Sequence, residues 1–302
     1  MALYESARAL IGDTPLVRLQ KFEKYYACRA RLYGKCEFLN PAGTVKDRTA
    51  LGMLTAALER GELERGGTAV CLTGGSGGVS AAMACAMLGL RCVLAAQDTM
   101  SLQDIRRARA YGAQVVISPA SVGVKGLRER AQSLLSQHPG GFLVDQFENN
   151  DNPLTHRGTT GPELLRDLPD IDALVAGIGT GGTITGCGEA IKMHRPDCLI
   201  VGVEPQDSPV ISGGLPARHS ITGIGPGFVP ETLNRYILDK VVRVRTQDAL
   251  EAARQLALTE GLLCGPSSGA ALAAAVFLGQ QTRLFDKAVA VILPDRGDGY
   301  LE

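Results

Sequence analysis

Short runs of apolar residues alternate along the chain with longer segments whose apolar positions recur at helical spacing. The short runs predict buried strands at residues 68–73, 91–97, 113–118, 142–147, 173–179, 198–205 and 288–294. The longer segments, several of them closed by glycine, predict helices at residues 79–90, 102–113, 127–137, 184–194, 248–261 and 267–280. This alternation favours an α/β fold with mostly parallel sheets flanked by helices.

The length and the charge of the chain limit the kinds of molecule that the protein is expected to bind. A chain of 302 residues can bury a large apolar core, and its length suggests two domains or lobes. Because 31 basic side chains balance 31 acidic ones, no overall field would hold nucleic acid or an anionic membrane surface. We therefore expect small solutes as partners, and neither nucleic acid nor membrane.

The cysteines predict free thiols in a reducing compartment. None of the eight belongs to a CxxC pair or to a Cys/His cluster with zinc-ligand spacing, so no metal site is expected. Most lie in apolar runs, where a free thiol behaves as a small buried hydrophobe. The first residues lack a basic segment followed by an apolar core and a cleavage site, which predicts a cytoplasmic location.

Three turns that lead into predicted helices are rich in glycine or serine, at residues 72–80, 177–186 and 264–272. Ligands of parallel sheets gather at the carboxyl ends of the strands, where such turns lie. Glycine is also a common turn residue, so a purely structural role explains any one turn about as well. Their combination with the lysine-bearing turn NPAGTVKDR (residues 40–48) indicates a binding site.

The turn after the strand at 173–179 has the composition of a phosphate site. Its glycines allow close approach of the backbone, its amides can converge on an anion and its threonines add hydroxyl donors; the residues are Gly179, Thr180, Gly181, Gly182 and Thr183. The same turn matches the dinucleotide fingerprint GxGxxG, with Glu204 as the acid that would bind the ribose. A nicotinamide-dependent oxidoreductase is therefore an alternative, although it leaves Lys46 and the other two turns without roles.

Lys46 itself is placed unusually for a cation. It lies at the start of an apparent helix, where the exposed N–H groups and the macrodipole favour anions. This environment and partial burial would disfavour the ammonium form and give a nucleophilic amine near neutral pH. The simpler alternative is an exposed lysine that lies along the first helical turn.

Lys46 in NPAGTVKDR, the GTGGT turn and the PSSGAA turn, in that order, resemble the fold type II family of pyridoxal-phosphate enzymes. The sequence is most similar to the cysteine synthase and cystathionine β-synthase branch. Further similar segments, spread over essentially the whole chain, are IGDTPLVRL, VDQFENNDNPLTHRGTTGPEL, VGVEPQDSPVI, GIGPGFVP and VILPDRGDGYL.

The resemblance implies a two-lobed α/β enzyme that binds pyridoxal 5'-phosphate. Each lobe would contain a mostly parallel twisted sheet flanked by helices. A smaller mobile lobe would span residues 41–145, and a larger cofactor-binding lobe would combine residues 1–40 and 146–302. Relatives in this branch are generally homodimers. We expect no further regulatory domain, a feature that is shared with the short bacterial cysteine synthases.

The resemblance also implies roles for the cofactor-binding residues. Lys46 would form a Schiff base with the cofactor aldehyde and later act as the general base. Residues 179–183 would hold the phosphate, and Ser267 would accept or share a hydrogen bond with the pyridine nitrogen. A hydroxyl holds that nitrogen protonated less well than a carboxylate does, so the ring would be a weaker electron sink. Ser267 fits a helix N-cap equally well, and both roles are compatible.

The substrate-binding residues implied by the resemblance are Thr73, Gly74, Gly77, Gln146 and Gly223. Here the sequence departs from the family, because the loop that usually reads TSGNTG reads TGGSGG at residues 73–78. Ser76 takes the place of an asparagine that contacts the phenolic oxygen of the cofactor, and glycines replace hydroxyl residues. Backbone N–H groups at a helix start can still bind a carboxylate.

The activity implied is β-replacement on an activated L-serine such as O-acetylserine, with sulfide as the nucleophile and L-cysteine as the product. The substrates would be a small amino acid and a small thiol or sulfide. The altered loop keeps a second activity open, in which cysteine itself is the substrate and hydrogen sulfide is released with pyruvate, serine or lanthionine as product.

Overall fold

A computed structural model describes residues 3–73 and 75–300. The chain divides into two compact units: the first comprises Met1–Ile11 and Asn40–Asn152, and the second Gly12–Leu39 and Pro153–Glu302. From the sequence we expect a smaller mobile lobe at 41–145 and a larger lobe at 1–40 plus 146–302. These bounds and the mobility of the smaller lobe stay predictions.

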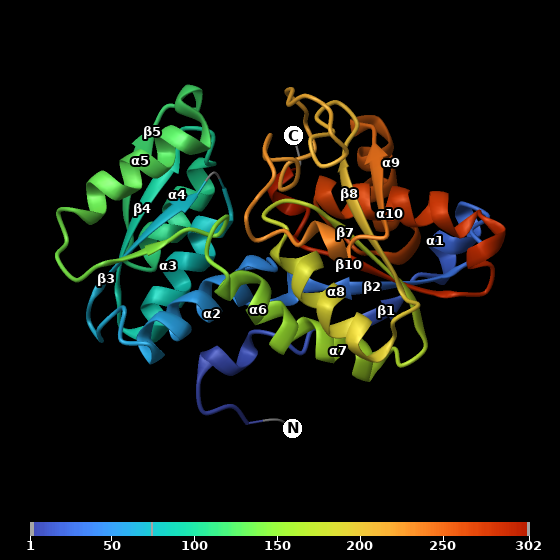
Figure 1. Ribbon diagram of the computed structural model, residues 1–302, viewed down its shortest axis with the longest axis horizontal. Helices are drawn as coiled ribbons and strands as arrows, with labels where there is room; N and C mark the ends of the chain where they lie inside the picture. Colours follow the sequence, from blue (N-terminus) through green and yellow to red (C-terminus); the bar gives the residue numbers. More distant parts are fainter. Residues whose placement is uncertain (1–2, 74, 301–302) are drawn as a thin grey trace. The chain divides into compact units, whose positions relative to one another are not determined.

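The first unit contains a four-stranded, all-parallel sheet in the order β5-β4-β3-β6. Its strands are β3 (Thr68–Thr73), β4 (Arg91–Gln97), β5 (Gln114–Ser118) and β6 (Phe142–Val144). Its helices are α2 (Lys46–Glu59), α3 (Gly77–Leu88), α4 (Leu102–Ala110) and α5 (Gly123–Leu135). One apolar layer joins the sheet to α2, α3 and α4, and a second joins the opposite face to α5 (Figure 1).

The second unit contains a six-stranded sheet in the order β1-β2-β10-β7-β8-β9, in which only the pairing of β1 with β2 is antiparallel. Its strands are β1 (Leu16–Arg18), β2 (Arg31–Cys36), β7 (Ile171–Gly177), β8 (Leu199–Pro205), β9 (Lys240–Val244) and β10 (Ala288–Leu293). The remaining helices are α1 (Gln20–Tyr25), α6 (Asp151–Gly158), α7 (Thr160–Asp167), α8 (Gly182–His194), α9 (Thr246–Glu260) and α10 (Pro266–Gly279). Helices α7 and α8 cover one face of the sheet, and α1, α9 and α10 cover the other (Figure 1).

The predicted fold class is confirmed, since both sheets are mostly parallel and flanked by helices. All seven predicted strands form, although the one expected at 142–147 ends at Val144. Strands β1, β2 and β9 were not predicted, because charged residues interrupt their apolar pattern, as in RLYGKC and KVVRV. Among the described residues, no helix is long and apolar enough to cross a membrane.

The eight cysteines are free, and all but Cys28 are buried. Burial raises the pKa of Cys36 to about 12 and that of Cys198 to about 12. At pH 8 only about one such thiol in 10⁴ is then ionised, and the thiolate is the reactive form. We expect iodoacetamide at pH 8 to leave both residues unmodified in the folded protein and to alkylate both in denaturant, as peptide mass mapping would measure. Rapid alkylation of either in the folded protein would contradict their burial.

Candidate functional site

Lys46 is the first residue of α2, and its neighbour Asp47 fixes this end of the helix. The Asp47 carboxylate accepts a hydrogen bond from the Ala42 N–H at 2.7 Å and another from the Ser80 hydroxyl at 2.5 Å. Ser80 belongs to α3, so this buried carboxylate joins the starts of two helices. It also places a negative charge where the helix dipole favours one. The backbone that carries Lys46 is therefore held in place.

Three of the predicted side chains converge on the start of α3. A Cβ atom added to Gly77 would lie 3.7 Å from Gln146 Oε1, 3.7 Å from Thr73 Oγ1 and 3.8 Å from Lys46 Cγ. Lys46, Gly77 and Gln146 also line a small pocket of about 20 Å³, which is enough for one water-sized group. The structure thus brings together Lys46, Thr73, Gly77 and Gln146, four residues that the sequence places in three separate segments.

The turn before α3 is held by hydrogen bonds between the Thr73 side chain and the backbone of Gly75. The Thr73 hydroxyl donates to the carbonyl of Gly75 at 3.0 Å and accepts from the N–H of the same residue at 3.2 Å. Ser76 is the N-cap residue of α3, and its hydroxyl makes no capping hydrogen bond. The first turn of α3 contains no acidic residue, and the positive end of the helix dipole favours an anion there. Gly74, also predicted to bind substrate, lies outside the described residues.

The turn predicted to bind phosphate connects β7 to α8, and its glycines are required by close packing. A Cβ atom on Gly179 would lie 2.4 Å from the carbonyl oxygen of Gly223. Gly181, the N-cap of α8, has a φ of +84°, and a Cβ there would lie 2.6 Å from Leu233 Cβ. No acidic residue occupies the first turn of α8. A tight backbone turn at the positive end of a helix fits a phosphate group.

A buried histidine contacts this turn through the hydroxyl of Thr183. Thr183 Oγ1 lies 3.1 Å from His156 Nε2, and the other ring nitrogen of His156 lies 2.8 Å from Thr160 Oγ1. His156 is fully buried, so its ring is held between two hydroxyl groups. No role of His156 was predicted, although this residue lies in the segment LTHRGTTGPEL, which carries part of the family resemblance.

Ser267 lies near the start of α10 and is almost completely buried. Its hydroxyl donates to Asp295 Oδ1 at 3.2 Å. The N-cap residue of α10 is Gly265, so the predicted alternative role of Ser267 as a helix N-cap is wrong. Gly223 has a φ of +89°, and a Cβ there would lie 3.6 Å from Ser267 Oγ. Gly179, Gly223 and Ser267 are therefore neighbours in the second unit.

Glu204, the acid that the alternative dinucleotide fingerprint would use to bind a ribose, already makes hydrogen bonds within the protein. Glu204 is buried, and its carboxylate accepts hydrogen bonds from the N–H groups of Ile211 at 2.8 Å and Ser212 at 3.1 Å, and from the Ser212 hydroxyl. These contacts fasten the segment after β8. Because both carboxylate oxygens serve this purpose, Glu204 does not act as the ribose-binding acid that the alternative requires.

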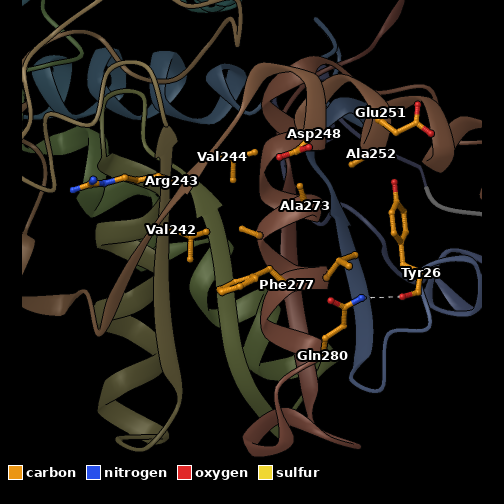
Figure 2. A pocket seen from close by; sticks show the side chains of 12 residues that line it. Tyr26, Val242, Arg243, Val244, Asp248, Glu251, Ala252, Ala273, Phe277 and Gln280 are labelled. Carbon is orange, nitrogen blue, oxygen red and sulfur yellow. Dashed lines mark hydrogen bonds between the residues drawn. The ribbon is translucent and has the colours of Figure 1, made fainter.

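A larger pocket of about 350 Å³ lies elsewhere in the second unit and contains none of the predicted site residues. It is formed by β9, α9, α10 and the end of α1, with a floor of valine and alanine side chains. Figure 2 shows Asp248 and Glu251 at one end and Phe277 and Gln280 at the other. These residues provide an apolar hollow but no nucleophile or convergent set of hydrogen-bond donors.

Comparison with known proteins identifies the family of the chain. Residues 7–295 match the family described as "Pyridoxal-phosphate dependent enzyme". A probable cysteine synthase of Bacillus subtilis (strain 168) is 43% identical over 296 residues, which are 97% of this chain and 94% of that protein.

Two solved structures are also similar. An O-acetyl serine sulfhydrylase isoform from Entamoeba histolytica has a TM-score of 0.94 and 33% identity, covering 99% of this chain and 90% of that chain. A hydrogen sulfide-producing enzyme from Fusobacterium nucleatum has a TM-score of 0.94 and 33% identity, covering 99% of this chain and all of the other. Pyridoxal phosphate is the cofactor, and the nicotinamide alternative is wrong. The chain belongs to the family of pyridoxal-phosphate dependent enzymes.

Proposed function

We propose that the protein forms L-cysteine by β-replacement, with an activated L-serine such as O-acetylserine as the first substrate and sulfide as the second. The observation that carries this proposal is the convergence of Lys46, Thr73 and Gln146 on the backbone of Gly77. It occurs in a chain that is 43% identical to a probable cysteine synthase over nearly its full length.

Three groups of residues would hold the cofactor. The turn from Gly179 to Thr183 would bind the phosphate through backbone N–H groups and threonine hydroxyls. Ser267 would contact the ring nitrogen, and Ser76 would lie near the phenolic oxygen. Lys46 would be the covalent attachment point. When bound, the cofactor supplies an aldehyde that joins amines and a ring that accepts electron density from the substrate.

The substrate carboxylate would be held at the start of α3. The Thr73 hydroxyl and the Gln146 amide lie beside Gly77, the first residue of that helix. These groups are uncharged, so they would orient the carboxylate without competing with the Lys46 amine for protons. Gly223, beside Ser267, would leave room for the bound amino acid. Lys46 would then remove the α-proton, the acetate at Cβ would leave and sulfide would add to Cβ.

A second activity, in which cysteine is the substrate and hydrogen sulfide the product, is favoured by the TGGSGG loop. Ser76 and Gly77 replace the amide and hydroxyl side chains expected from the family, so fewer side chains select the substrate. One similar structure is a hydrogen sulfide-producing enzyme. The same proton abstraction by Lys46 would serve both activities, because they differ in the group that leaves Cβ and in what reacts afterwards, and both of these steps follow the proton removal.

Substrate preference tests the proposal directly. We expect the cofactor-loaded enzyme to form cysteine from O-acetylserine and sulfide faster than it releases hydrogen sulfide from cysteine alone. The two initial rates would be measured on one preparation, with O-phosphoserine plus sulfide as a comparison substrate and O-acetylserine without sulfide as the blank. A much greater rate with cysteine would make the second activity the principal one.

We also propose that the enzyme works as a cytoplasmic homodimer. The support is the resemblance to a branch whose members are generally dimers, together with the reduced state of its cysteines.

A further inference from the structure

Gly77 differs from Gly78 and Gly179, because neither its backbone nor its packing requires a glycine. A Cβ atom on Gly78 would lie 2.6 Å from Thr73 Cγ2. A Cβ atom on Gly77 would meet its nearest neighbours at 3.7 Å or more, which is ordinary contact, and the φ of Gly77 is not positive. Glycine also weakens a helix relative to alanine. The space that the missing side chain leaves therefore calls for a functional explanation.

This space lies at the mouth of the hollow of about 20 Å³ in the first unit. Lys46, Gly77 and Gln146 line the hollow and are only half-buried, so they form its mouth. The other lining residues are buried and form its floor; they are Thr49, Ala50, Met53, Cys71, Leu72, Ala81 and Val144. A hollow of this size holds one group as large as a water molecule or a methyl group.

The floor suits an apolar group better than water. Five of its seven residues are alanine, methionine, leucine or valine. The Thr49 hydroxyl donates to the carbonyl of Lys46 at 3.1 Å, so its hydrogen is already used. A buried water needs about two to four polar partners, whereas a methyl group needs none. The hollow is therefore a place for one small apolar group.

The part of a substrate that would reach this hollow is its carboxyl end, which the proposed function places at the start of α3. Among the residues that the structure describes, 3–73 and 75–300, Lys46 is the only charged side chain that lines the hollow. The helix dipole favours a carboxylate there, and burial of a methyl group would favour an ester. These two effects are similar in size. The surroundings of Gly77 therefore fit a small neutral ester about as well as the free acid.

We propose that the hollow beside Gly77 is a subsite for one methyl-sized group on the carboxyl end of the substrate, and that Gly77 determines this specificity by leaving the mouth open. The enzyme then accepts small neutral carboxyl derivatives, such as amino-acid methyl esters, besides free amino acids. This inference rests on the proposed function, in which the carboxylate binds at the start of α3.

The test compares two ligands that have no leaving group on Cβ, L-alanine and L-alanine methyl ester. Their Kd values would be measured on cofactor-loaded enzyme from the change in absorbance of the cofactor. In the wild type, the Kd of the ester should be within about tenfold of the Kd of L-alanine.

Two variants fill the hollow from different walls. Gly77→Ala adds a methyl group at the mouth, and Ala50→Val adds carbon at the floor. Each should raise the ratio of the ester Kd to the acid Kd at least about tenfold, because one methyl-sized group in an apolar pocket changes recognition about 10- to 200-fold. The comparison of ratios cancels the difference between the amines of the two ligands. Gly75→Ala is the matched control in the same turn, since a Cβ there meets nothing within 4 Å, and it should leave the ratio unchanged.

The proposal is overturned if the wild type binds L-alanine but not the ester. It is equally overturned by an unchanged ratio in either filled variant that folds and binds the cofactor, and if one variant does not fold, the other decides. A wild-type enzyme that binds neither ligand and does not turn over O-acetylserine would instead count against the proposed function.

Discussion

Replacing Lys46 with alanine should abolish turnover while the protein stays folded. The variant would lose both the amine that attaches the cofactor and the base that removes the α-proton. A positioned general base alone contributes about 10²- to 10⁴-fold to a rate. We therefore expect a loss of at least about 10³-fold in the rate of cysteine formation, measured with O-acetylserine and sulfide.

The structure permits this substitution. Lys46 is partly exposed at the first position of α2, and alanine is a better helix former than lysine. The contacts of Asp47 that hold the helix start come from the neighbouring residue and are not removed. Circular dichroism and thermal unfolding of the variant should therefore be close to those of the wild type.

Two control variants distinguish the loss of the amine from the loss of the positive charge and from general effects of substitution. Lys46→Arg keeps a cation but cannot supply an unprotonated amine, so it should be as inactive as the alanine variant. Lys125→Ala, at an exposed position of α5 in the same unit, should be fully active. Borohydride reduction followed by digestion should label the peptide that contains Lys46 in the wild type. Substantial activity in Lys46→Ala would refute the assignment.

The sequence predicts those parts of the fold whose apolar pattern lies within a single short segment of the chain. The runs at 68–73 and 288–293 are buried along their whole length, so every position had to be apolar or small, and both were predicted. Strand β2 is equally central, because it pairs with β1 and β10. It was missed because it contains Lys35, and a lysine in a central strand makes sense only with partners that lie far along the chain.

The same distinction applies to the site. Glycines at positions such as Gly179 leave a local signature in the sequence, since a turn after a strand cannot accept a side chain there. His156 and Asp295 leave none, because their partners Thr183 and Ser267 lie 27 and 28 residues away. Their roles depend on which hydroxyl the fold brings to each polar group. Local pattern therefore predicts the turns, and the tertiary structure supplies the residues that support them.

Replacing Lys35 with methionine should lower the stability of the second unit strongly. The Lys35 side chain is completely buried, with Nζ 2.7 Å from Glu163 Oε2, and it donates to the carbonyl of Thr14 at 2.6 Å. The other oxygen of Glu163 accepts the Asp13 N–H at 3.0 Å, so one ion pair joins β2, α7 and the segment before β1. Removing the cation would leave a buried carboxylate beside Asp167 without its compensating charge. Breaking a buried pair in this way costs about 3–5 kcal/mol.

Urea denaturation would measure this loss as a lower midpoint with an unchanged slope, on cofactor-free protein so that ligand binding does not add to stability. The control is Lys287→Met, because Lys287 is half exposed and pairs with Asp172 at 3.2 Å on the surface, where such pairs contribute at most about 1 kcal/mol. Adding Glu163→Leu to Lys35→Met should restore part of the loss, since it removes the uncompensated charge. A loss no larger than that of the control would mean that the buried pair is not what holds β2 and α7 together.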